Sequence, residues 1–263
     1  MSVVEAIILG VIQGLTEFLP VSSSGHLELA QALFGNQNNA EGNLLFTIVV
    51  HGATALATLV VFRSDVWSIV RGLFQFTNNE SAQFSLRIVL SMIPAALVGY
   101  FIEDVISSQF FGNTLLVGLM LWITAGLLYI ADKPTQNRAN VSLTNSWWIG
   151  IAQAFAILPG ISRSGATIAI SLLLGVARDQ AARFSFLMVV PLIFGSMAKK
   201  ILDGGLEQEV LNLTPILAGF VAAFFSGYLA CQWMIALVKR SQLRYFAYYC
   251  ALVGTIALVT SLV

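Results

Sequence analysis

Long apolar stretches separated by short polar ones make up most of this chain. The hydrocarbon core of a bilayer needs about 20 apolar residues per helix. Six segments reach that length, and we expect each to form a transmembrane helix: residues 44–62, 88–106, 113–131, 184–202, 213–235 and 245–263. The pattern therefore predicts an all-α, polytopic membrane protein.

Two other apolar stretches, residues 3–34 and 146–175, are each interrupted by a break. The first contains Pro20 followed by Ser-Ser-Ser-Gly, and the second contains Pro159-Gly followed by Ser-Arg-Ser-Gly. Proline and glycine stop a helix and free backbone polar groups. At membrane depth such backbone must be buried in protein or line a polar cavity. We therefore interpret both stretches as re-entrant helical hairpins.

The two hairpins resemble each other at an offset of 140 residues. Gly-Val-Ile-Gln at 10–13 matches Gly-Ile-Ala-Gln at 150–153, and Ser-Ser-Ser-Gly at 22–25 matches Ser-Arg-Ser-Gly at 162–165. Three predicted spans follow each hairpin, and because three is odd, the second copy must be inverted. Inverted-topology repeats bring broken helices together near the bilayer midplane. Within one membrane domain, we expect repeats at residues 1–131 and 141–263.

The composition agrees with a membrane protein and excludes several other classes. Charged residues are 10% of the chain, hydrophobic residues are 57% and mean hydropathy is +0.84. A soluble domain averages about 25% charged residues. These values exclude a soluble enzyme and a disordered chain, and the formal net charge of zero excludes a nucleic-acid partner, which needs a net basic face.

Basic residues gather on one predicted side of the membrane. The connections on the side away from the N-terminus hold ten of them: Arg63, Arg71, Arg87, Lys133, Arg138, Arg178, Arg183, Lys239, Arg240 and Arg244. The other side holds Lys199 and Lys200. Positive charge marks the cytoplasmic side. We therefore expect both termini, and the opening of the first hairpin, to face outward.

The first hairpin carries an ionisable residue at its tip. Gln13 and Glu17 are four residues apart and share one helix face. A charged residue at the centre of a membrane helix costs about 2.5–3.5 kcal/mol, which makes Glu17 a functional candidate. The alternative is a glutamate that extends outward to the interface.

Three hydroxyls and a histidine follow this tip. Ser22, Ser23 and Ser24 precede His26 at the start of the next half-helix. Serine commonly caps helices, and the free N–H groups of a helix N-terminus also bind anions. His26 is either a buried, hydrogen-bonded histidine or an acid/base group, and we favour the second because Glu17 and the hydroxyls are near.

The second break offers the groups that hold a phosphate. Arg163 is the basic residue that we place inside the membrane, and Ser162, Ser164, Gly165 and Thr167 surround it at the start of a half-helix. Arginine binds phosphate oxygens through two parallel hydrogen bonds. The alternative is an arginine that pairs structurally with the acid of the first hairpin. Together the two half-helix N-termini predict a polyanion site near the midplane.

These segments resemble the two signatures of the bacterial undecaprenyl pyrophosphate phosphatase family, also known for bacitracin resistance. Gln13 to His26 fits an acid-rich (E/Q)xxxE segment, and Pro159 to Thr167 fits PGxSRSxxT. The resemblance covers essentially the whole chain. It implies an inner-membrane enzyme that removes the terminal phosphate of undecaprenyl diphosphate and so recycles the lipid carrier of peptidoglycan synthesis.

The resemblance also implies roles for individual residues. Site residues carried over by position are Glu17, His26, Ser162, Arg163, Ser164 and Thr167. Ser23 holds the position of a possible nucleophile, and an activated water is the alternative. Gln13 stands where many members have Glu, which weakens any scheme with two carboxylates. The family's activity is associated with a divalent cation, Mg²⁺ or Ca²⁺. With Glu17 as the one carboxylate ligand, such an ion would depend on the diphosphate oxygens.

His51 lies in the first full predicted span and is a further candidate for the diphosphate pocket. An equally well supported interpretation is that His51 has a structural role, hydrogen-bonded between helices. Its counterpart at the offset of 140 is Pro191, which predicts a break or bend in the matching helix. The residues that we expect to bind the diphosphate are Gln13, Ser22, Ser24, His51, Ser162, Ser164, Gly165 and Thr167.

Two other functions compete with the phosphatase. Inverted repeats with broken helices are common in transporters, so a polyprenyl-phosphate flippase could use the same midplane anion site. A channel fits less well, because no polar stripe follows several spans. The partners that we expect are the polyprenyl diphosphate and the surrounding membrane lipids, and the sequence also allows a homo-oligomer.

Overall fold

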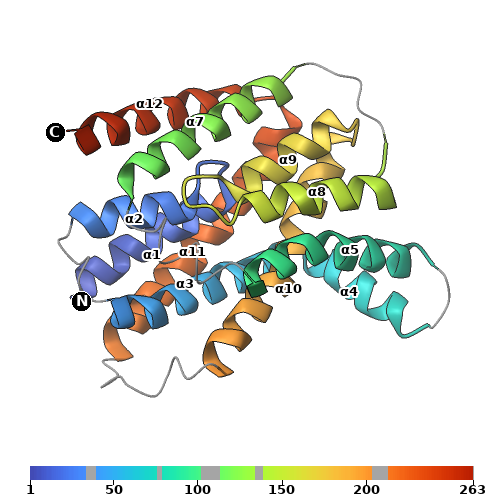
Figure 1. Cartoon of the computed structure of the whole chain (residues 1–263). Helices are drawn as coiled ribbons and strands as arrows, with labels where there is room; N and C mark the ends of the chain where they lie inside the picture. The colour runs from blue at the N-terminus through green and yellow to red at the C-terminus, as the bar shows by residue number, and fades with distance from the viewer. Residues whose placement is uncertain (34–39, 76–78, 102–112, 134–138, 203–212, 263) are drawn as a thin grey trace.

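The structure, a computed structural model, describes residues 1–33, 40–75, 79–101, 113–133, 139–202 and 213–262. These residues are helical apart from turns and one isolated bridge between Ala139 and Val176. The helices of the described residues (Figure 1) are α1 (Val3–Phe18), α2 (Ser23–Leu33), α3 (Ala40–Val61), α4 (Arg63–Leu73), α5 (Glu80–Phe101), α7 (Thr114–Ala131), α8 (Leu143–Phe155), α9 (Arg163–Leu173), α10 (Arg178–Leu202), α11 (Leu213–Lys239) and α12 (Leu243–Leu262). The predicted all-α class is confirmed for this part of the chain.

Five of the described helices are long and apolar enough to cross a membrane, namely α5, α7, α10, α11 and α12. The segment Leu45–Val61 together with α4 would make a sixth. Most predicted spans fall on these helices, but α5 and α10 begin earlier than expected, at Glu80 and Arg178. The end of the span expected at 88–106 lies outside the described residues.

Helix α4 lies in a stretch that we predicted to be only a connection. It follows α3 after Phe62, and its axis turns by 81° from that of Leu45–Val61. Asp65 in its first turn and Arg71 in its last turn complement the helix dipole. At Pro191, where we predicted a break or a bend, α10 continues without a break.

Both predicted breaks are present, one between α1 and α2 and the other between α8 and α9, and the helices on either side of each break contact each other. In the second break Gly160 adopts a φ of +96°, and a Cβ there would lie 2.6 Å from the carbonyl oxygen of Val117. Thr124 of α7 holds this loop, because its Oγ1 donates to the Gly160 carbonyl (3.2 Å) and accepts from the N–H of Ser162 (3.0 Å). These two backbone groups of the break are thus hydrogen-bonded inside the protein.

Helix pairs in the first half of the chain have counterparts in the second half. Helix α1 packs against α11, as α8 packs against α5, and α3 contacts α11, as α10 contacts α5. Gly10 lies against the backbone of Gly219, and Gly150 lies against the backbone of Ser91. Helices α7 and α12 meet each other (Figure 1) at Gly118 and Gly254, where a Cβ on either glycine would be 2.9 Å from the carbonyl oxygen of the other.

Charged groups hold the helix connections together at one end of the molecule. The Asp132 carboxylate accepts hydrogen bonds from the N–H groups of Leu243 (3.1 Å) and Arg244 (3.2 Å), and so caps α12. Arg183 of α10 pairs with Asp65 of α4 at 2.7 Å. The two chain termini lie at the opposite end (Figure 1). The connections that we predicted to share one side therefore lie together.

The tight contact between α1 and α11 generates a stability prediction. A Cβ on Gly14 would lie 2.0 Å from Ser226 Oγ and 2.6 Å from the Ala223 carbonyl oxygen. Overpacking of this kind destabilises the folded protein by about 1–3 kcal/mol. The higher helix propensity of alanine over glycine contributes about 1 kcal/mol in the other direction, so we expect the overpacking to dominate. We expect Gly14→Ala to lower the Tm of the detergent-purified protein.

The matched control is Gly126→Ala on α7, where a Cβ would meet nothing within 4 Å. We expect this variant to have an equal or higher Tm, because alanine has a higher helix propensity than glycine and meets no steric clash there. Equal Tm values for the two variants would contradict the close approach of α1 and α11.

Candidate functional site

The Glu17 carboxylate lies at the centre of a group of polar side chains. It is on the last turn of α1, and its side chain is 4% exposed. Its Oε2 accepts hydrogen bonds from Gln13 Nε2 (2.9 Å) and Ser23 Oγ (3.0 Å). His51 Nε2 lies 3.8 Å from the same oxygen. The predicted pairing of Gln13 and Glu17 on one helix face is therefore confirmed.

Arg163 pairs with the other oxygen of this carboxylate. The Arg163 Nη2 contacts Glu17 Oε1, which joins the first residue of α9 to the end of α1. Removing one partner of a buried ion pair typically costs about 3–5 kcal/mol, because the other charge stays buried. Glu17 and Arg163 therefore each offset the cost of burying the charge of the other.

The two half-helices begin with matching hydrogen bonds at the predicted offset. Ser22 Oγ accepts from the N–H of Gly25 (3.4 Å), and Ser162 Oγ accepts from the N–H of Gly165 (3.1 Å). Ser22 and Ser24 place their hydroxyls 3.4 Å apart, the same separation as in the equivalent pair of the second hairpin. Ser22 and Ser162 therefore cap their half-helices, and all four serines remain candidates for anion binding.

Other predicted hydroxyls brace the backbone of the site. Ser164 Oγ donates to the Leu19 carbonyl (3.3 Å), which ties the second hairpin to the break of the first. Thr167 Oγ1 donates to the Arg163 carbonyl (2.9 Å), within the first turn of α9. In this state both hydroxyls are used internally, so neither is directed at a ligand.

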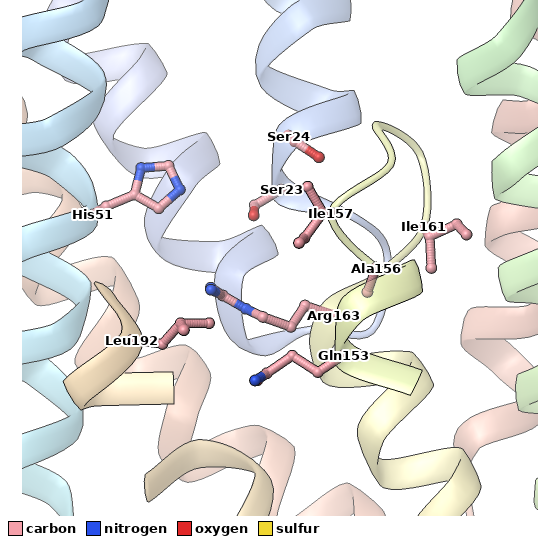
Figure 2. Close-up of a pocket in the computed structure, with 9 residues that line it drawn as sticks. All are labelled: Ser23, Ser24, His51, Gln153, Ala156, Ile157, Ile161, Arg163 and Leu192. Carbon is pink, nitrogen blue, oxygen red and sulfur yellow. The ribbon is translucent and has the colours of Figure 1, made fainter. Parts of the chain in front are cut away.

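A cavity of about 160 Å³ opens beside the Glu17–Arg163 pair. Figure 2 shows Ser23 and Ser24 on one side of it, with the Arg163 and Gln153 side chains reaching toward Leu192 and His51. The residues that line it are Ser23, Ser24, His51, Gln153, Ala156, Ile157, Ile161, Arg163 and Leu192. A cavity of about 150 Å³ binds a molecule as large as benzene, so a phosphate-sized group fits here.

A second, much smaller cavity of about 10 Å³ touches the same ion pair. Both Glu17 and Arg163 line it, together with Ser185 and Phe186 of α10. The hydroxyl of Ser185 is buried and has no hydrogen-bond partner among the described residues. Arg163 therefore lines both cavities, whereas Glu17 lines only the smaller one.

The two histidines differ in their relation to this site. His51 lines the larger cavity, and its Nδ1 donates to the Thr47 carbonyl (2.8 Å), which leaves Nε2 toward Glu17. His26 instead lies against α12: its Nδ1 donates to the Ser22 carbonyl (2.8 Å), and its Nε2 is 2.8 Å from the Tyr249 hydroxyl. A carbonyl accepts only, so neutral His26 accepts a hydrogen bond from Tyr249.

Sequence reasoning missed two polar residues of the site. Gln153 lines the cavity, and its only signal was its match to Gln13 at the repeat offset. Thr124 holds the second break from α7, and nothing in its apolar surroundings distinguishes it. Both were hidden because a sequence that is apolar nearly everywhere does not reveal which polar residue faces inward.

The side chains present do not form a resident cation site by themselves. Among the described residues no three His, Cys, Asp or Glu side chains gather in a group that could hold a metal ion. Glu17 Oε1 contacts the Arg163 guanidinium, and Glu17 Oε2 accepts from Gln13 and Ser23. Divalent cations such as Mg²⁺ and Ca²⁺ need several oxygen ligands, and a single engaged carboxylate does not supply them.

Comparison with known proteins gives relatives over the full length of the chain. A protein named undecaprenyl-diphosphatase from Christiangramia forsetii is 55% identical over 98% of each chain. Proteins of the same name from Bacteroides fragilis and Methanobrevibacter smithii are 49% and 36% identical, again over at least 97% of each chain. The family model described as bacitracin resistance protein BacA matches residues 6–256. This chain therefore belongs to the bacitracin resistance protein BacA family.

Proposed function

We propose that this protein hydrolyses undecaprenyl diphosphate to undecaprenyl phosphate and inorganic phosphate. The observation that carries the proposal is the cluster of Glu17, Ser23 and Arg163 beside one cavity. It combines a base, a hydroxyl nucleophile and a guanidinium, the groups that phosphoryl transfer needs. The full-length relatives named undecaprenyl-diphosphatase support the same activity. The reaction would recycle the carrier lipid of cell-wall synthesis and so confer bacitracin resistance.

The cavity suits the head of the substrate and not its tail. Small-molecule pockets usually measure about 300–1,000 Å³, whereas this one measures about 160 Å³. We propose that the diphosphate enters the cavity while the polyprenyl chain stays among the lipids. Arg163 and the N–H groups at the start of α2 and α9 would bind its oxygens.

In the proposed first step, the phosphate oxygens displace Glu17 from Arg163 and free the carboxylate to act as a base. Ser23 Oγ, which already donates to Glu17 Oε2, attacks the terminal phosphorus. The new O–P bond forms as the bond from phosphorus to the bridging oxygen breaks. Undecaprenyl phosphate leaves with that electron pair, and the hydroxyl proton passes through Glu17 to solvent. Arg163 stabilises the charge that develops on the phosphoryl oxygens.

In the second step, water attacks the phosphoseryl phosphorus and the Oγ–P bond breaks. Glu17 takes a proton from the water and returns one to Ser23 Oγ, so inorganic phosphate leaves and the serine is restored. His26 remains a proposed proton-handling residue. Because its Nδ1 is held by the Ser22 carbonyl, only Nε2, at the Tyr249 hydroxyl, can exchange a proton. The divalent cation that the resemblance implies would enter with the diphosphate, held by its oxygens.

We further propose six membrane spans and two re-entrant hairpins in an inverted repeat. The matching helix pairs and the reciprocal contact between Gly118 and Gly254 are what a pseudo-two-fold axis produces. The basic connections gather at one end and both termini at the other. We assign the basic end to the cytoplasm, so the termini and the mouth of the cavity would face the outer side of the bacterial cytoplasmic membrane.

A lipid flippase is the second candidate, and one observation favours it. The Arg163 guanidinium lines both cavities, as a group between two access paths for a lipid head would. Flipping, however, needs no nucleophile, whereas Ser23 is within hydrogen-bonding distance of a carboxylate. We therefore retain hydrolysis as the main proposal.

The proposed function predicts phosphate release by the purified protein in detergent. Hydrolysis needs no membrane gradient, so polyprenyl diphosphate should yield inorganic phosphate, measured colorimetrically. Arg163→Ala should lower kcat/KM by about 100-fold or more, as for loss of a group that stabilises the transition state. Arg163→Lys, which keeps a charge beside Glu17, controls for folding. No phosphate release by the wild-type protein, with lipid translocation in vesicles, would support the flippase instead.

The covalent step predicts that Ser23→Ala loses at least about a thousandfold in kcat, as for loss of a nucleophile. Acid-quenched wild-type protein should carry phosphate from a substrate labelled on its terminal phosphate. Ser261→Ala is the control, because Ser261 does not line the cavity and its hydroxyl donates to the Leu258 carbonyl within α12. Near-normal turnover of Ser23→Ala would eliminate the phosphoseryl route and leave direct attack by water.

The proposed orientation predicts the outcome of a C-terminal reporter fusion. Alkaline phosphatase folds only outside the cytoplasm, so it should be active when fused after α12, which ends at Leu262. The same reporter fused in the connection after Lys239 should be inactive. The reverse pattern of activity would overturn the assignment of the two sides.

A further inference from the structure

Gln153 has an arrangement that the proposed mechanism leaves unexplained. It lies near the end of α8, and the residue is 1% exposed. Both polar atoms of its carboxamide are buried without a hydrogen-bond partner among the described residues. Leaving such a group unsatisfied costs about 1–3 kcal/mol. Since buried polar groups are nearly always satisfied, a ligand is the natural partner for this amide.

The location of the amide points to that ligand. Gln153 lines the cavity together with Ser23 and Arg163. Figure 2 shows its side chain extending alongside that of Arg163, in the same direction. A group bound by the guanidinium would therefore lie next to the amide.

The repeat explains why this amide has no partner within the protein. Gln13, its counterpart, donates to the carboxylate of Glu17. At the offset of 140, the position equivalent to Glu17 is Ile157, and the position equivalent to Ser23 is Arg163. The second hairpin therefore lacks the acceptor that its glutamine would otherwise bind. It keeps the amide, has an isoleucine in place of the carboxylate, and has a guanidinium in place of the hydroxyl.

We infer that Gln153 is a second diphosphate-binding residue, which donates its Nε2–H to a phosphoryl oxygen held by Arg163. This inference rests on the proposed function. The two hairpins then have different roles. The first supplies the base and the nucleophile, and the second supplies the hydrogen-bond donors that bind the anion. The Gln153 Oε1 accepts a hydrogen bond from water or from a protonated phosphate oxygen.

The test uses Gln153→Leu, which keeps the shape and removes both polar atoms. Replacing an unsatisfied buried amide by an apolar group is neutral or stabilising, so the Tm should stay equal or rise. The kcat/KM for polyprenyl diphosphate should fall by about 10- to 100-fold, the usual effect of losing a hydrogen bond to a charged group. A merely structural role predicts the opposite, a lower Tm together with any loss of activity.

Inorganic pyrophosphate serves as a probe that does not depend on turnover. It should raise the Tm of the wild-type protein, and this shift should shrink in Gln153→Leu. Gln232→Leu, on an exposed position of α11, is the matched control and should behave as wild type. If Gln153→Leu does not fold, Gln153→Met provides the same measurement with a more flexible side chain.

The outcomes separate the two claims. If the wild-type protein releases phosphate and Gln153→Leu keeps both normal kcat/KM and a normal pyrophosphate shift, the role of Gln153 is refuted while the function stands. If the wild-type protein releases no phosphate, the function fails, and the pyrophosphate shift still decides whether Gln153 contacts an anion.

Discussion

The ion pair between Glu17 and Arg163 is the interaction on which the site depends. It joins the end of α1 to the start of α9, and so connects the two hairpins at the breaks where their helices stop. With its side chain only 4% exposed, the Glu17 carboxylate would be costly to keep charged without this partner. The sequence is electrically neutral overall, yet the pair concentrates opposite charges beside one cavity. In the proposed mechanism, an anion that enters this cavity competes with Glu17 for the guanidinium.

This competition links the contacts of the ion pair to the proposed chemistry. Both oxygens of Glu17 are engaged, one by Arg163 and the other by Gln13 and Ser23, and the guanidinium is occupied. A bound diphosphate would release the base and engage the guanidinium in the same event, so the site becomes reactive only when substrate is present. Other contacts hold the two breaks, and with them Glu17 and Arg163, in position. Thr124 fixes the second break, and Ser164 ties it to the Leu19 carbonyl of the first.

Much of this arrangement could be predicted from the sequence, because bilayer length and helix breaks leave strong signals. The broken helices, the contact face of Gln13 and Glu17, and the inward position of Arg163 follow from such signals. Helix α4 was missed because a short amphipathic helix lacks the length signal of a span. The sequence also could not show that His26 faces Tyr249, since which way a side chain points depends on helix rotation set by distant contacts.

The most direct test of this account is a structure of the protein with a non-hydrolysable polyprenyl methylene-diphosphonate bound. The account predicts that the diphosphonate lies in the cavity beside Ser23, with Arg163 bound to its oxygens and separated from Glu17. A structure in which the Glu17–Arg163 pair stays intact while the diphosphonate binds elsewhere would contradict it.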